Sequence, residues 1–132
     1  MAHTNTIFNQ MLSLIPKQVF AALERKHITV RKPRTFSLWA QFTVLAFIQL
    51  AARRSMRDGI RSLADSSKKL YHLGIRRVAR STFSDANNSR PADFFKDLFG
   101  EMYTRCQPVA PKHKFRFKSK LLSLDASTIK LC

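Results

Sequence analysis

Apolar residues recur along the first half of the chain at the three- and four-residue spacing that is typical of helices. The first such stretch begins at Ile7 and is expected to end near Pro16, and the second runs from Val19 to about Lys26. The most apolar stretch, Phe36 to Ala52, carries no charge, so we expect it to form a central helix buried on most sides. Its expected core residues are Trp39, Phe42, Phe47 and Leu50.

The same stretch, Phe36 to Ala52, raises the alternative of a membrane span. It is shorter than the roughly 20 apolar residues that a spanning helix needs. It also contains polar residues, among them Gln41 and Gln49. We therefore expect a buried helix of a helical domain, with no membrane partner.

The stretch from Ser55 to Pro91 has the pattern of two short helices joined by a tight turn. Ser55 and Asp58 have the spacing of a capping box, and apolar residues follow at helical spacing. Gly74 suits the turn, because glycine adopts positive φ without strain. Ser81 is expected to cap a second helix from Thr82 to about Asn88, which Pro91 ends. This order predicts a helix-turn-helix.

Basic and small polar residues surround the second of these helices. In a helix-turn-helix, arginines hold phosphates while polar side chains of the second helix face base edges. The alternative is an ordinary helical hairpin with a solvated polar face. The residues expected to contact DNA are Arg53, Arg54, Arg57, Arg61, Arg76, Arg77, Arg80, Ser81, Thr82, Ser84, Asn87, Asn88 and Arg90.

Charge is strongly unbalanced and unevenly distributed. The chain holds 24 Lys and Arg against 8 Asp and Glu, a formal net charge of +16. Residues 31–80 contain 12 basic and 2 acidic residues, whereas residues 81–101 contain 2 basic and 4 acidic residues. Such an imbalance indicates an anionic partner, either nucleic acid or an anionic membrane surface. The segregation favours one directed basic face.

The segment after Pro91 has an apolar stripe at helical spacing: Phe94, Phe95, Leu98, Phe99, Met102 and Tyr103. We expect a packing helix whose acidic residues, Asp93, Asp97 and Glu101, form a solvated face and not a metal site. Two cysteines and four scattered histidines give no zinc spacing. The first ten residues have no signal-peptide pattern, so an intracellular protein is expected.

The periodicity changes after a linker with two prolines at residues 107–111. From Lys112 to Lys120 basic residues alternate with other residues, which is typical of a strand. Leu121, Leu122 and Leu124 then precede Asp125. An acid at the end of a buried strand suits a catalytic carboxylate, but it is also an ordinary turn former.

Together these stretches resemble bacterial insertion-sequence transposases of the DDE type, in particular the IS-four family. The resembling segments are Ser55–Asp58, Leu70–Ile75, Arg80–Arg90, Lys114–Lys118 and Leu121–Ile129. The resemblance implies an N-terminal helical domain that binds the terminal inverted repeats of the element. It also implies a ribonuclease-H-like domain whose carboxylate triad holds divalent metal, with Asp125 as the first carboxylate and metal ligand.

The resulting interpretation is a mainly α chain in three parts. Residues 1–106 form a helical DNA-binding domain with a helix-turn-helix, residues 107–111 a linker, and residues 112–132 the first strands of an incomplete ribonuclease-H-like domain. Because the other two triad acids would follow Cys132, we expect this chain to bind double-stranded DNA without cutting it. Magnesium would serve only a full-length parent, which would carry out cut-and-paste transposition.

Three further expectations accompany this interpretation. The chain itself is expected to need no cofactor. We expect it in the bacterial cytoplasm, associated with the nucleoid, and leave self-association open. The alternative function is a stand-alone helix-turn-helix transcriptional regulator, in which residues 112–124 would form a complete β-wing. A membrane-associated basic protein is a third, less favoured alternative.

Overall fold

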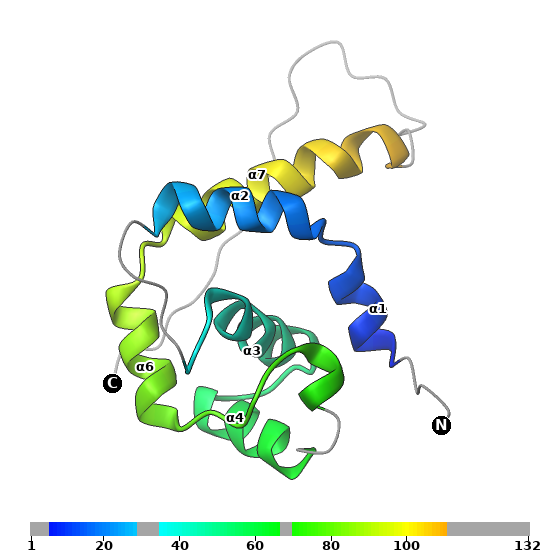
Figure 1. Ribbon diagram of the computed structural model, residues 1–132. Coiled ribbons are helices and arrows are strands. Elements are labelled where there is room, and N and C mark those ends of the chain that lie inside the picture. The colour runs from blue at the N-terminus through cyan, green and yellow to red at the C-terminus, as the bar shows by residue number, and fades with distance from the viewer. Residues whose placement is uncertain (1–5, 29–34, 67–69, 111–132) are drawn as a thin grey trace.

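The chain is mainly helical in the part that the computed structural model describes, residues 6–28, 35–66 and 70–110. Figure 1 shows the helices in order, with two short 3-10 turns, and no strand occurs in these ranges. The helices are α1 (Ile7–Ser13), α2 (Lys17–His27), α3 (Leu38–Leu50), α4 (Met56–Asp65), α6 (Arg80–Ser89) and α7 (Asp93–Cys106), and the 3-10 turns are Tyr71–Leu73 and Gln107–Val109. The mainly helical prediction is confirmed. The expected strands at 112–132 and Asp125 lie outside the described residues.

Hydroxyl side chains cap three of these helices. Thr6, Ser37 and Ser55 each accept a hydrogen bond from a backbone N–H of the first turn of α1, α3 and α4, respectively. The Ser55 cap, from Asp58 N–H at 3.2 Å, was predicted from the sequence. The predicted Ser81 cap is wrong. Helix α6 begins two residues earlier than expected, after Ala79, and has no side-chain cap.

Two chain reversals share one hydrogen-bonding pattern. After α3, Ala52 N–H donates to Gln49 O and Arg53 N–H donates to Ile48 O, with Ala52 at φ 48°. After the Tyr71–Leu73 turn, Gly74 at φ 69° is the residue with positive φ, as the sequence predicted. This is the Schellman arrangement, in which glycine is the usual residue with positive φ. Alanine at the first reversal is therefore strained.

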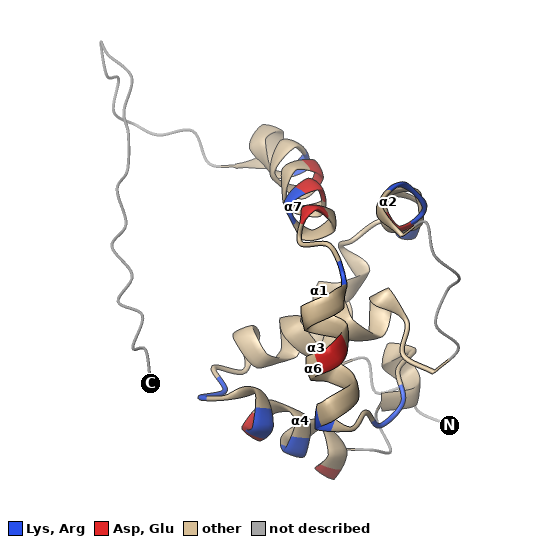
Figure 2. Cartoon of the chain, turned by 90° about the vertical axis from the view of Figure 1, so that its left-hand side faces the viewer, with Lys and Arg blue, Asp and Glu red and all other residues tan. Residues whose placement is uncertain are grey.

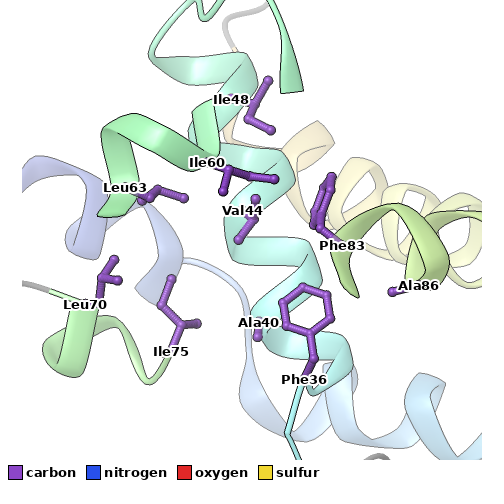
Figure 3. Close-up of a cluster of buried hydrophobic side chains, with 10 residues drawn as sticks. All are labelled: Phe36, Ala40, Val44, Ile48, Ile60, Leu63, Leu70, Ile75, Phe83 and Ala86. Carbon is purple, nitrogen blue, oxygen red and sulfur yellow. The ribbon is translucent and has the colours of Figure 1, made fainter. Parts of the chain in front are cut away.

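Helix α3 lies at the centre and packs on both sides. One face, together with Phe36, joins apolar residues of α4, of α6 and of the segment between them (Figure 3). We call this the α6 cluster; it consists of Phe36, Ala40, Val44, Ile48, Ile60, Leu63, Leu70, Ile75, Phe83 and Ala86. Because α3 packs against neighbouring elements on more than one side, apolar residues lie all around the helix. The prediction of a buried central helix is confirmed.

A second cluster joins α2, α7 and the start of α3. It consists of Phe20, Leu38, Phe94 and Leu98, and we call it the α7 cluster. Figure 1 shows α2 and α7 side by side above α3, α4 and α6. Trp39 packs against both clusters and donates from Nε1 to the backbone oxygen of Leu73 at 3.2 Å. Trp39 thus connects the two halves of the core.

Three expected core positions are exposed. Leu50, at the end of α3, is 55% exposed because the chain reverses there and nothing in the described residues covers it. Phe99 and Tyr103 lie on the side of α7 opposite Phe94 and Leu98, where their rings stack with centroids 5.9 Å apart. The apolar stripe of α7 is wider than the surface that α2 and α3 cover.

The connection between α4 and α6 is longer than that of a standard helix-turn-helix. The two helices contact each other and both pack on α3. The described residues between them, however, include Leu70 to Ala79 and with them the Tyr71–Leu73 turn. A standard helix-turn-helix uses three or four residues there. Leu70 and Ile75, which flank the Gly74 turn, each occupy a place in the core between the helices.

Helices α3 and α4 approach each other closely at Gly59. A Cβ atom built on Gly59 would overlap Cγ1 of Ile48 in α3. Only glycine lets the two backbones lie at this distance, which holds the first turn of α4 against the end of α3. Among the helices described, none is both long and apolar enough to cross a bilayer.

Candidate nucleic-acid interface

An open hollow of about 690 Å³ lies between the first turns of α4 and α6. Its walls come from two separate parts of the sequence, which the packing of both helices on α3 brings together. The lining residues are Ser55, Met56 and Arg57 from the α4 side and Arg80, Ser81, Ser84 and Asp85 from the α6 side. Hydroxyl groups, two guanidinium groups and helix N-termini are groups that bind phosphate oxygens. Asp85 adds one acid to this wall.

Further arginines extend the basic character on both sides of the hollow. Arg61 lies one turn beyond Arg57 on α4, and Arg76 and Arg77 lie in the chain that leads into α6. Figure 2 shows the basic residues along α4 in blue. All of these side chains are exposed. We call Arg57, Arg61, Arg76, Arg77 and Arg80 the basic surface. None of them forms an ion pair with an acid of the described residues.

Arg53 and Arg54 follow α3 and are not part of the hollow's lining. The guanidinium of Arg53 lies over the ring of Phe47, 5.8 Å from its centroid. Both residues are exposed. Arg53 and Arg54 therefore lie at the α3–α4 junction, next to the basic residues of α4.

Helix α6 is amphipathic. Phe83 and Ala86 enter the α6 cluster, and the exposed side is polar. Ser81, Thr82 and Asn88 are exposed, and Ser84 is half-buried at the hollow. The predicted reading residues therefore do share one helix beside the basic surface.

Arg90 has a different place from the one expected of a DNA contact. Its guanidinium donates to the backbone oxygens of Phe36 and Ser37, the latter at 3.1 Å, and to Gln41 Oε1 at 2.9 Å. It also lies over the Phe36 ring, 5.3 Å from the centroid. Burial lowers the pKa of Arg90 from its ordinary value, while the carboxylate of Glu24 raises it. Its donors hold the start of α3 to the end of α6, so we remove Arg90 from the DNA contacts.

Gln41 was not recognised as a site residue from the sequence. It is 1% exposed, and its Nε2 donates to Asn87 Oδ1 at 2.8 Å. The only sign of its role in the sequence is a polar residue within an otherwise apolar helix. That polar residue served above as an argument against a membrane span. Asn87, expected to face a base, is thereby tied to the core on one side.

The sequence predicts a solvated Asp97, but in the structure its carboxylate contacts two side chains of α2. Its Oδ2 atom accepts from Lys26 Nζ at 2.7 Å and contacts His27 Nε2 at 2.8 Å, which joins α7 to α2. The hydrogen bond from Lys26, followed by that from His27, lowers the pKa of Asp97. No group of three or more His, Cys, Asp or Glu within the described residues is arranged to hold a metal ion.

Comparison with known families adds one match. The family described as "Domain of unknown function (DUF4372)" matches residues 3–76, which is more than half of the chain. The chain belongs to the DUF4372 family. The DUF4372 match includes α1 to α4 and the Gly74 turn, so it supplies the α4 wall of the hollow, while α6 follows the matched part. No curated protein and no solved structure is significantly similar to the chain.

Proposed function

We propose that this DUF4372 chain binds double-stranded DNA through the basic surface and the polar side of α6. The observation that carries the proposal is the group of five exposed arginines without acidic partners in the described residues, two of which line a hollow formed by two helix starts. Unpaired arginines on a protein of net charge +16 attract polyanions, and the release of counterions from DNA favours binding.

In this proposal the two helices have different tasks. The arginines of α4 and of the chain before α6 hold phosphates and so fix the orientation of the protein. Helix α6 enters the major groove with its exposed polar side chains towards the base edges. The long connection between α4 and α6 places Arg76 and Arg77 beside α6, where they extend the phosphate contacts.

The resemblance to IS-four transposases suggests which DNA the chain would bind. We propose that the DNA is the terminal inverted repeat of a mobile element, bound in the nucleoid of a bacterial cell. The helical domain would then supply end recognition to a DDE transposase. Strand cleavage would be the task of the parent's ribonuclease-H-like domain, with Asp125 as one of its magnesium ligands.

The test is duplex binding across a salt series. If the five arginines of the basic surface each neutralise a phosphate, log K should fall with log[salt] with a slope of about −4 to −5. The double variant Arg57→Ala, Arg80→Ala should reduce that slope by roughly 2. Fluorescence anisotropy with a labelled duplex measures both quantities.

A charge-matched control distinguishes a directed surface from net charge alone. Arg25 on α2 and Arg105 on α7 are exposed and lie outside the basic surface. The double variant Arg25→Ala, Arg105→Ala removes the same charge and should leave the slope almost unchanged. Equal losses in the two double variants, or binding that does not respond to salt, would refute the proposal.

A further inference from the structure

A chain of hydrogen bonds connects Arg90, through the buried Gln41, to the exposed Asn87 on α6. Arg90 donates to Gln41 Oε1 at 2.9 Å, and Gln41 Nε2 donates to Asn87 Oδ1 at 2.8 Å. Gln41 is 1% exposed and therefore cannot touch a DNA ligand itself. The chain thus links an internal arginine to a surface side chain of the proposed reading helix.

The direction of every hydrogen bond in this chain is fixed by its first member. A guanidinium has donors only, so the atom of Gln41 that faces Arg90 must be the amide oxygen. The amide nitrogen of Gln41 consequently faces Asn87, and it must donate to an acceptor there. Asn87 therefore turns its Oδ1 atom towards Gln41, and the rival orientation of either amide would place two donors against each other.

The consequence is that one acceptor position of Asn87 Oδ1 is occupied by Gln41, whereas the Nδ2 donors of Asn87 have no partner among the described residues. A bidentate contact between asparagine and adenine needs an acceptor and a donor on the same exposed edge of the amide. On Asn87 that contact would need Oδ1 to accept a second hydrogen bond beside the one from Gln41, whereas a contact with two acceptors of a base needs only the free N–H donors. The side chain of Asn88, by contrast, is exposed and forms no hydrogen bond in the described part of the chain.

We propose that Asn87 is a specificity-determining residue that selects guanine, because guanine presents two acceptors, N7 and O6, in the major groove. The proposal rests on the DNA-binding function proposed above and names a base that α6 reads. It also divides the task between neighbours: Asn87 donates to guanine, and Asn88 retains the donor and acceptor that adenine requires.

The first experiment selects bound duplexes from a randomised library with the full chain and sequences them. The wild-type chain should enrich guanine at one position. Asn87→Asp keeps the size of the side chain and an acceptor for Gln41, but it replaces the exposed donors with a carboxylate oxygen. This variant should lose the guanine preference by roughly 5- to 150-fold and favour cytosine, whose N4 amino group is a donor.

The second experiment changes the buried residue alone. Gln41→Glu keeps an acceptor for Arg90 but loses the donor to Asn87, so the Asn87 amide turns over and exposes its oxygen. The base preference at the guanine position should then be lost, while affinity for non-specific DNA and its salt slope stay unchanged. A merely structural role of Gln41 would instead weaken binding to all sequences alike.

Thr43→Val is the matched control. Thr43 is fully buried on the same helix, and its hydroxyl donates to Trp39 O and makes no contact with Asn87. This variant should leave the base preference unchanged, and thermal unfolding verifies that all variants are folded. If the wild-type chain binds no duplex, the proposed function fails and this inference with it. If the chain binds DNA but Asn87→Asp and Gln41→Glu keep the wild-type base preference, only the inference is overturned. The same conclusion follows if Asn87→Asp removes a preference for adenine instead of guanine.

Discussion

The α2–α7 pair contains an ion pair between its two helices, whereas the α3–α4–α6 unit contains none among the described residues. In the pair, Lys26 and His27 meet Asp97 across the helix interface, at 2.7 and 2.8 Å. In the α3–α4–α6 unit, the five arginines of the basic surface have no acidic partner among the described residues. Both regions are built around α3 with aromatic cores, so the contrast lies in the surface and not in the packing.

The contrast shows which charges are available to a ligand. The sequence places 24 basic residues along the chain, but an ion pair formed by folding neutralises part of that charge locally. Lys26 is engaged in this way, and Arg90 is engaged by backbone oxygens. Two of the arginines that have no acidic partner among the described residues, Arg57 and Arg80, line the hollow between α4 and α6. Unneutralised cations at one place are more informative about a partner than net charge.

The largest expected effect on stability comes from truncating a buried phenylalanine in either cluster. Phe83 and Phe94 are both fully buried, one in each cluster. Phe83→Ala and Phe94→Ala should each lower the free energy of unfolding by about 3–5 kcal/mol, because each leaves a cavity. Urea denaturation followed by circular dichroism measures this. Since Trp39 joins the clusters, each variant should still unfold in one transition; two separate transitions would show that the regions fold independently.

Two glycines give a matched pair, one in each region. Gly59→Ala should destabilise the fold by about 1–3 kcal/mol, because the new methyl group would overlap Ile48. Gly100→Ala should stabilise it by about 0.5–1 kcal/mol, because nothing lies within 4 Å and alanine is the better helix former. Thermal melts of both variants are the measurement. A stable Gly59→Ala protein would mean that α3 and α4 separate at little cost.

Much of the fold was predictable from local patterns. The helix spacing, the Ser55 cap and the Gly74 turn each depend on residues close in sequence, and these predictions are confirmed. The Ser81 cap was wrong because Ala79 already has the extended backbone that precedes α6. The roles of Arg90, Gln41 and Asp97 depend on partners between 46 and 71 positions away, which no local pattern reveals.

A smaller effect is expected at the two chain reversals of the α3–α4–α6 unit. Ala52→Gly should stabilise the protein by up to about 1 kcal/mol, because it relieves a positive φ in a residue with a Cβ atom. Gly74→Ala should have the opposite sign and a similar size. Chemical denaturation of the two variants tests this. If Ala52→Gly is destabilising, the gain in flexibility of the unfolded chain outweighs the relieved strain.

The smallest expected effect is the response of the α2–α7 pair to acid. The pKa of Asp97 is lowered in the folded protein, chiefly by the hydrogen bond from Lys26. The carboxylate therefore adds stability above its unfolded pKa of about 4, and this contribution is lost as pH falls through the lower folded value. Melting temperatures of the wild-type chain and Asp97→Asn, measured from pH 7 to 2, should converge at the acid end. A constant difference would show that the carboxylate charge is not involved.

The position of Trp39 allows its fluorescence to report on the structure around it. It is the single tryptophan of the chain, and its indole touches Phe20 on α2, with ring centroids 5.0 Å apart, while its N–H reaches Leu73 beside Gly74. One emission spectrum therefore registers whether α2 remains docked and whether the segment leading to α6 keeps its place. A ligand that moves α6 would change the indole's hydrogen bond, and so the emission wavelength, without any attached dye.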